Sequence, residues 1–156
     1  MIRKDYIERL IEQFAAAVGA LLKLRRERKT EEAQQLLRDT ALSLLGMEYG
    51  TLTMADAAST AKLLGHPLRV AVLARLLAEE GALLEQKGEP ASASTRWVLA
   101  LELFLEAQAM GAKLEEEDAW VSAELRQKVE PSLLSERHQQ LLAREYERAA
   151  ENLKKV

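Results

Sequence analysis

The side chains that could do chemistry in this chain are few, and the first to consider are a serine and a histidine near its end. Ser135 and His138 stand one helical turn apart, so they can share a hydrogen bond of the kind that activates a serine nucleophile. A nucleophile also needs an orienting group and donors for an oxyanion, and no glycine-rich segment lies near this pair. We therefore expect His138 to be a partly buried helix residue, and we expect no catalytic residues.

A metal site is not expected either. The chain has no cysteine, which excludes disulfides, thiolate ligands and thiol nucleophiles. Its two histidines, His66 and His138, lie far apart, and a zinc or iron site needs three or four ligands at workable spacing. We expect no metal and no cofactor. An enzyme with a carboxylate-lined site remains an alternative, because Glu, Asp and Arg are abundant and one sequence does not reveal their grouping.

The strongest cluster of charge is the basic run KLRRERK at residues 23–29. Such a run could neutralise phosphates, on which nucleic-acid affinity first depends. It lacks interleaved aromatic residues, and basic side chains in the last turn of a helix also stabilise the negative end of the helix dipole. We interpret the run as a helix end and expect no nucleic-acid binding.

No segment of the sequence suggests a membrane protein. The longest uninterrupted apolar run, residues 14–22, is far shorter than the ~20 residues that a membrane-spanning helix needs. Asp5, Glu8 and Glu12 precede it, which does not fit a signal peptide or an anchor on anionic lipid. We expect a cytoplasmic protein that does not bind membranes.

The composition predicts the kind of fold that must position these residues. Apolar residues make up 48% of the chain but aromatic residues only 4%, and Ala, Leu, Glu, Arg and Gln predominate, as in helices. A chain of 156 residues suits one domain with one core. We predict an all-α fold, a single domain over residues 1–156, built from about seven helices.

Apolar periodicity and breaker residues place these helices as three antiparallel hairpins with a connector helix after the first. The last two helices are expected to pair with each other. The expected helices are residues 4–29, a second helix capped by Thr30, a connector capped by Thr53 and ending at Leu64, a helix from Pro67 to the turn at Gly88 and Pro90, a fifth ending at Gly111, residues 115–129, and a last helix from Ser132.

The chain is organised around the hairpin of the fourth and fifth helices. Gly88 and Pro90 mark its turn, and both helices are so apolar that they must be covered on more than one face. Glycine inside a helix costs about 1 kcal/mol relative to alanine, so Gly81 has a packing reason. We predict that it lies against the second helix near Ala93 and Trp97.

Six positions of this hairpin are in the register of a tetratricopeptide repeat (TPR), in which a small residue of the first helix meets an alanine and an aromatic residue of the second. They are Leu77, Gly81, Leu84, Ala93, Trp97 and Ala100. With the opening segment KDYIERLIEQF, residues 4–14, the hairpin resembles a family of small bacterial all-helical proteins with TPR-like pairs and no assigned activity. The resemblance implies a TPR-like stack. We expect Trp97 in the core, and Trp120 as well.

The same resemblance implies where a ligand would bind, because TPR domains bind ligands in a groove lined by the first helix of each pair. In this register the groove-facing residues are Arg75, Ala78, Ala82, Glu85 and Gln86. Some TPR proteins clamp a peptide carboxylate with lysine and asparagine where this chain has Ala78 and Ala82, so the resemblance implies a flatter contact. We expect Arg75 to supply charge, with Glu85 and Gln86 making polar contacts at the rim.

These observations favour a non-catalytic module that binds a protein or peptide partner. The evidence is the TPR-like hairpin together with the lack of any catalytic constellation. The alternative is a structural protein that forms a homo-oligomer through an apolar stripe on a terminal helix.

Overall fold

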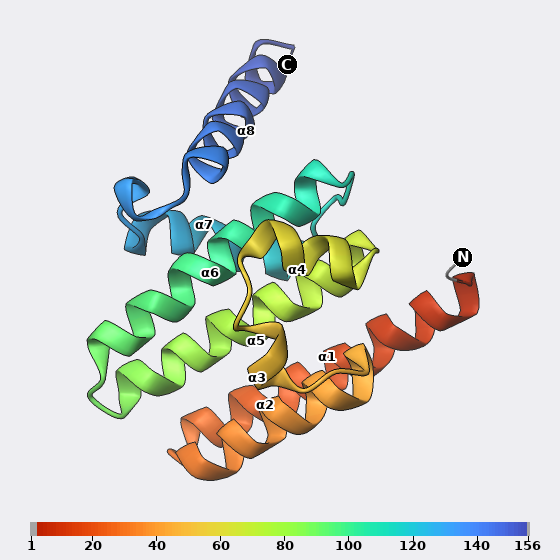
Figure 1. Ribbon diagram of the computed structural model, residues 1–156, viewed down its shortest axis with the longest axis vertical. Coiled ribbons are helices and arrows are strands. Elements are labelled where there is room, and N and C mark those ends of the chain that lie inside the picture. Colours follow the sequence, from red (N-terminus) through yellow and green to blue (C-terminus); the bar gives the residue numbers. More distant parts are fainter. Residues whose placement is uncertain (1–2, 156) are drawn as a thin grey trace.

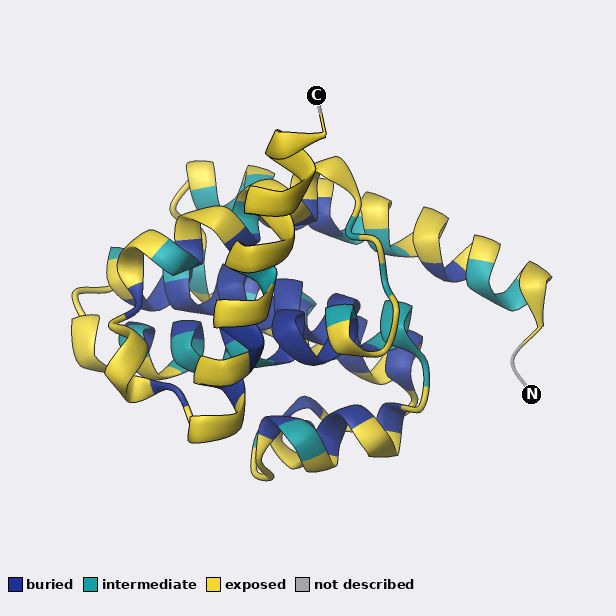
Figure 2. Ribbon diagram, turned by 90° about the horizontal axis from the view of Figure 1, so that it is seen from above, coloured by how far each residue is buried: buried dark blue, intermediate teal, exposed yellow. Residues whose placement is uncertain are grey.

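A central hairpin of two long helices carries most of the core in the computed structural model, which describes residues 3–155. Helix α5 spans Pro67–Gln86 and α6 spans Pro90–Ala109, and they run side by side through the middle of the molecule (Figure 1). Their connecting turn places Gly88 at φ +82°, a left-handed conformation that glycine adopts without strain. Fourteen of the 20 residues of α5 and nine of the 20 residues of α6 are buried, and the buried parts of the chain gather toward the middle of the molecule (Figure 2). Helices on several sides pack against the hairpin, so the prediction that it is covered on more than one face is confirmed.

Gly81 brings the two helices of the hairpin into close contact. A Cβ atom at this position would overlap the indole ring of Trp97, so only glycine fits beneath that ring. The indole Nε1 donates a hydrogen bond of 3.2 Å to the backbone oxygen of Ala78, and Trp97 is 8% exposed. The predicted packing of Gly81 against Trp97 is therefore confirmed.

The remaining helices surround this hairpin, and the described residues contain no strand, so the all-α prediction is confirmed. Together with α5 and α6 they form one domain. They are α1 (Lys4–Arg26), α2 (Thr30–Leu45), α3 (Tyr49–Leu52), α4 (Ala57–Leu64), α7 (Glu116–Lys128), the 3-10 helix η1 (Pro131–Leu133) and α8 (Glu136–Lys154).

Helices α1 and α2 form the predicted first hairpin and pack against α5, while α4 rests on both central helices. The last two helices depart from the prediction. Instead of pairing mainly with each other, α7 and α8 each pack on α6. The physical reason is that neither α7 nor α8 has an apolar face long enough for the two helices to pack along their length. The buried residues of α7 are Asp118, Ser122 and Leu125, and those of α8 are His138, Leu141 and Leu142.

Two predicted helix starts are wrong because a nearby residue makes the cap. Asp56, not Thr53, caps the main connector helix, and its Oδ1 accepts a hydrogen bond of 2.7 Å from the backbone nitrogen of Ser59. Helix α2 begins at Thr30 as predicted, but Thr30 is its first residue and makes no side-chain cap. The last helix begins after Ser135, whose hydroxyl accepts from the backbone nitrogen of His138 at 3.2 Å, and not at Ser132.

The first helix also ends earlier than expected, at Arg26. Arg28 lies in the left-handed region with φ 58°, which a helix cannot continue through, so the chain turns there toward α2.

Candidate functional site

The five residues predicted to line a groove lie together in the structure. A cleft of about 570 Å³ opens between α1, α5 and α7, and Arg75, Ala78, Ala82, Glu85 and Gln86 all line it. Their spacing of three and four residues places them on one face of α5. We call this cleft the α5 groove.

Small residues form the centre of the groove and an aromatic ring forms part of its wall. Ala78 and Ala82 line the cleft with side chains of a single methyl group, and Trp97 of α6 also lines it. The ammonium group of Lys128, at the end of α7, lies 4.4 Å from the centroid of the Trp97 ring, within range of a cation–π interaction. The ring is therefore held by Ala78 on one helix and by Lys128 on another.

Arg75 does not present a free charge at the groove, which corrects the prediction. Its side chain is 4% exposed, and three carboxylates surround it. Its Nε donates to Glu79 at 3.0 Å, Nη1 to Asp118 at 3.0 Å and Nη2 to Glu117 at 2.7 Å. Arg75 thus fastens α7 to α5 beneath the groove, and a buried charge is kept because it is paired on every side.

The three acidic partners are what sequence reasoning missed. Glu79 was detectable, because it stands four residues after Arg75 on the same helix. Glu117 and Asp118 stand 42 and 43 residues after Arg75 in the sequence. No local pattern connects them to α5.

The burial of this cluster changes how its groups titrate. Burial alone would lower the pKa of Arg75. The hydrogen bond to Glu117 and the neighbouring Glu79 outweigh burial and raise this pKa above its ordinary value, so the guanidinium stays charged. Burial raises the pKa of Asp118 above its ordinary value, against the opposing effect of Arg75. The guanidinium of Arg75 is therefore stabilised in its charged form, whereas burial disfavours the charged form of Asp118.

Helix α1 is attached to the groove by polar contacts. Arg25 Nη1 donates to Glu79 at 2.9 Å, and Gln86 Nε2 donates to the backbone oxygen of Arg25 at 3.0 Å. The other amide atom of Gln86, Oε1, is buried with no hydrogen-bond partner. Arg25 belongs to the basic run that could have bound phosphates, and here it is engaged by a carboxylate within the protein.

The rim of the groove contains a large exposed aromatic residue. Trp120 lies on α7 with 68% of its surface exposed, so the expectation that it belongs to the core is wrong. Glu85, which also lines the cleft, is exposed as well. An exposed tryptophan beside a cleft is the kind of side chain that anchors protein partners.

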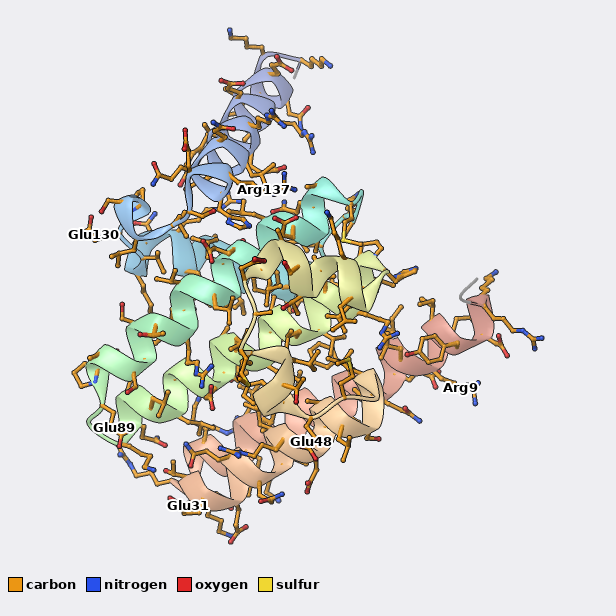
Figure 3. The ribbon with its side chains drawn as sticks, in the orientation of Figure 1. Arg9, Glu31, Glu48, Glu89, Glu130 and Arg137 are labelled. Atoms are coloured by element: carbon orange, nitrogen blue, oxygen red, sulfur yellow. The ribbon has the colours of Figure 1, made fainter. Side chains whose placement is uncertain are left out.

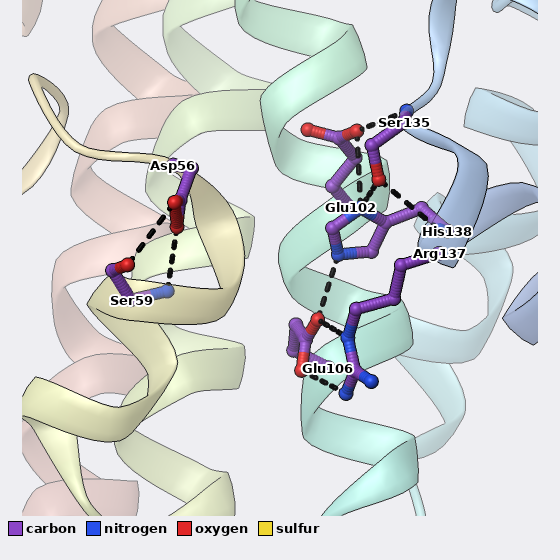
Figure 4. A network of polar contacts seen from close by, with 7 residues as sticks. All are labelled: Asp56, Ser59, Glu102, Glu106, Ser135, Arg137 and His138. Atoms are coloured by element: carbon purple, nitrogen blue, oxygen red, sulfur yellow. Dashed lines mark hydrogen bonds and ion pairs between the residues drawn. The ribbon is translucent and has the colours of Figure 1, made fainter.

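The sequence also singled out Ser135 and His138, and the structure brings them into direct contact between the Ser135 hydroxyl and His138 Nδ1. His138 is 3% exposed, and its Nε2 lies 2.7 Å from Glu106 Oε2. Glu102 lies 3.2 Å from Nδ1, and Arg137 makes two hydrogen bonds to Glu106 of 2.7 and 2.9 Å. Figure 4 shows this network bridging α6 and α8, and Figure 3 places Arg137 at the junction of the two helices.

The two glutamates favour the charged form of the imidazole. Burial opposes this, but hydrogen bonds and charge from Glu102 and Glu106 raise the pKa of His138 above its ordinary value. The hydrogen bond from Arg137 lowers the pKa of Glu106. Because Ser135 caps α8 and His138 is enclosed by carboxylates, this arrangement fastens one helix to another.

His66, the other histidine, is also a capping residue. Its Nδ1 accepts a hydrogen bond of 3.1 Å from the backbone nitrogen of Leu68, at the start of α5. Within residues 3–155, no three His, Asp or Glu side chains are grouped so that they could hold a metal ion. Over the same residues, no helix combines the length and apolarity that crossing a membrane requires.

Comparison of the chain with protein families, with curated proteins and with solved structures finds no match. The geometry of the chain itself is therefore the basis for assigning a function.

Proposed function

We propose that the protein is a binding module that holds a segment of a partner protein in the α5 groove. The observation that carries this proposal is the grouping of all five groove residues around one cleft of about 570 Å³, with Trp120 exposed at its rim. A TPR-like use of the first helix of a hairpin as the binding face fits this placement. No catalytic role is part of the proposal.

The lining of the groove indicates what kind of segment it would bind. Its walls combine the apolar faces of Trp97 and Trp120 with charges of both signs. Buried Gln86 Oε1 is an acceptor that lacks a donor, and a backbone N–H of an inserted segment would satisfy it. The matching partner is an amphipathic protein segment with an apolar side chain against Trp120 and charges at its ends.

The second candidate function is self-association, in which the partner is another copy of the chain. The observation that favours it is exposed apolar surface on the terminal helices, where Ile11 is 41% exposed and Leu153 is 77% exposed. A homo-oligomer would cover such residues.

Site-specific photocrosslinking distinguishes these candidates. A photoreactive phenylalanine analogue in place of Trp120 should crosslink a distinct partner in cells, and the same analogue in place of Tyr146 should not. Tyr146 is the matched control because it is an aromatic residue of α8, 52% exposed and outside the groove.

A second substitution tests the groove itself. Ala82→Trp should fill the centre of the cleft and abolish the crosslink, provided that circular dichroism shows an unchanged helix content. A crosslink that persists in the folded Ala82→Trp variant, or that forms equally at Tyr146, would show that the groove is not the binding site. A product with twice the mass of the chain would favour the homo-oligomer.

A further inference from the structure

A second cavity lies at the other end of the molecule, where α6, α7 and α8 meet. Its volume is about 510 Å³, within the usual range for small-molecule sites. Gln108 of α6, Ser122 and Arg126 of α7, and Glu145 and Arg148 of α8 line it. We call it the C-terminal cavity; it shares no lining residue with the α5 groove.

Three polar atoms without a hydrogen-bond partner are buried in residues that line this cavity. They are Gln108 Oε1, Ser122 Oγ and Arg126 Nε. Ser122 is 1% exposed, so its hydroxyl is among the most enclosed polar groups of the described chain. A buried polar atom without a partner costs about 1–3 kcal/mol, and folded proteins keep few of them. Three around one cavity point to a ligand that supplies the missing partners.

The charges around the cavity indicate the sign of that ligand. Glu145 is already engaged, because it accepts from Gln108 Nε2 at 3.2 Å and pairs with Arg148 at 3.4 Å. Lys113 and Arg126 make no ion pair with any described residue. The cavity therefore has an excess of positive charge and favours an anion.

Arg126 is held in place for such a contact. Its guanidinium lies 5.4 Å from the centroid of the Tyr146 ring, a cation–π distance. An arginine fixed on its face in this way offers its edge, including Nε, to a planar carboxylate.

We propose that the C-terminal cavity binds a small organic anion that carries both a carboxylate and a hydroxyl group. Arg126 Nε and the Ser122 hydroxyl donate to the carboxylate, and Gln108 Oε1 accepts from the ligand hydroxyl. Lys113 supplies a second positive charge at the cavity wall. Binding of this ligand involves no chemical reaction. The proposal does not depend on the partner binding proposed for the α5 groove.

Three probes of nearly equal size test this chemistry: malate, succinate and aspartate. Malate has the hydroxyl group, succinate lacks it, and aspartate replaces it with an ammonium group that Lys113 and Arg126 repel. Each would be titrated into isotopically labelled protein while the backbone amide resonances are recorded. Malate should shift the resonances of residues 108, 122 and 126 and should bind more tightly than either of the others.

Two substitutions connect binding to the named atoms. Ser122→Ala removes an unpartnered hydroxyl, so it should leave the melting temperature unchanged or raise it, while weakening malate binding by about 10- to 100-fold. Arg126→Gln should weaken binding over a similar range. Arg144→Gln is the matched control, because it removes one positive charge from the exposed surface of α8 outside the cavity, and it should bind malate like the parent.

The proposal fails if malate shifts none of these resonances at millimolar concentration. It also fails if succinate or aspartate binds as tightly as malate, since the ligand hydroxyl would then contribute nothing. A Ser122→Ala variant that loses stability but keeps its affinity would show that the hydroxyl has a structural role instead.

Discussion

Helix α6 is held against its two long neighbours, α5 and α8, by different physical means. Against α5 it presents apolar side chains, with the Trp97 ring filling the space left open by Gly81. Against α8 it presents Glu102 and Glu106, which pair with His138, while Arg137 pairs with Glu106 alone. Packing of the first kind is nearly independent of pH and salt, whereas a charged junction depends on both. The packing of α5 against α6 should therefore change little with pH and salt, whereas the attachment of α8 to α6 should depend on both.

The largest expected effect is at the apolar contact. Trp97→Ala should lower the free energy of unfolding by about 3–5 kcal/mol, because it removes a large buried ring and leaves a cavity. Chemical denaturation monitored by circular dichroism measures this loss. The loss should appear at any pH at which the domain is folded.

Glycine substitutions provide a matched control for the close approach itself. Gly81→Ala should destabilise the domain, since its methyl group overlaps the Trp97 ring. Gly19→Ala is the same change in α1, where the new methyl group meets no atom within 4 Å, and it should stabilise the helix by up to about 1 kcal/mol. Equal melting temperatures for these two variants would contradict the packing described for the hairpin.

A smaller and more local effect is expected at the charged junction. Glu106→Ala leaves His138 and Arg137 without their shared acceptor and should weaken the attachment of α8 by about 1.5–3 kcal/mol. Hydrogen exchange should show reduced protection in α8 and little change in α5. Glu147→Ala, which removes an exposed carboxylate of α8 outside the network, should change neither. Equal loss of protection in α5 and α8 would show that the two contacts are not independent.

The smallest effect follows from titration of the same network. Because the pKa of His138 is raised in the folded protein, its ion pairs stabilise the attachment of α8 fully at a pH below 6.5, the ordinary pKa of histidine. This stabilisation is lost as the pH rises through the raised pKa. Because the pKa of Glu106 is lowered in the folded protein, its contacts stabilise this attachment fully at a pH above 4.5, the ordinary pKa of glutamate. This stabilisation is lost as the pH falls through the lowered pKa. Protection factors of α8 amides should therefore be greatest between about pH 4.5 and 6.5, the interval between these two ordinary values.

A matched pair of histidine variants checks this dependence. His138→Gln should remove the alkaline loss of protection in α8, and His66→Gln should preserve it. An α8 whose protection is the same at pH 5.5 and pH 8.5 in the parent protein would disprove the role of the imidazolium.

The parts of the fold that could be predicted from the sequence are those with local signals. Pro67, the turn at Gly88 and the end of α6 near Gly111 depend on backbone preferences of one or two residues, and the structure places them as expected. Close packing at Gly81 could be predicted because glycine destabilises a helix unless a close contact requires it. The start of α8 was misplaced because Ser132 and Ser135 are equally good caps by type, and tertiary contact decided between them: the Ser135 backbone nitrogen donates to Glu102 at 2.8 Å.

The candidate site was predictable in position but not in electrostatics. Helical spacing was enough to group Ala78, Ala82, Glu85 and Gln86, since that requires only a period of 3.6 residues. The state of Arg75 depends on α7, whose place beside α5 no local pattern encodes. Trp120 was misassigned for the same reason, because side-chain type alone favours the core for tryptophan but does not reveal which face of α7 is covered.

The two tryptophans of the chain, one buried and one exposed, give the protein a pair of built-in optical reporters. Trp97 is enclosed in the hairpin, so its fluorescence should be blue-shifted and protected from a quencher such as acrylamide until the domain unfolds. Trp120 at the rim of the α5 groove should emit at longer wavelength and be quenched freely. A single titration can therefore distinguish occupation of the groove, which would shield only the red-shifted component, from loosening of the core, which would expose the blue-shifted one.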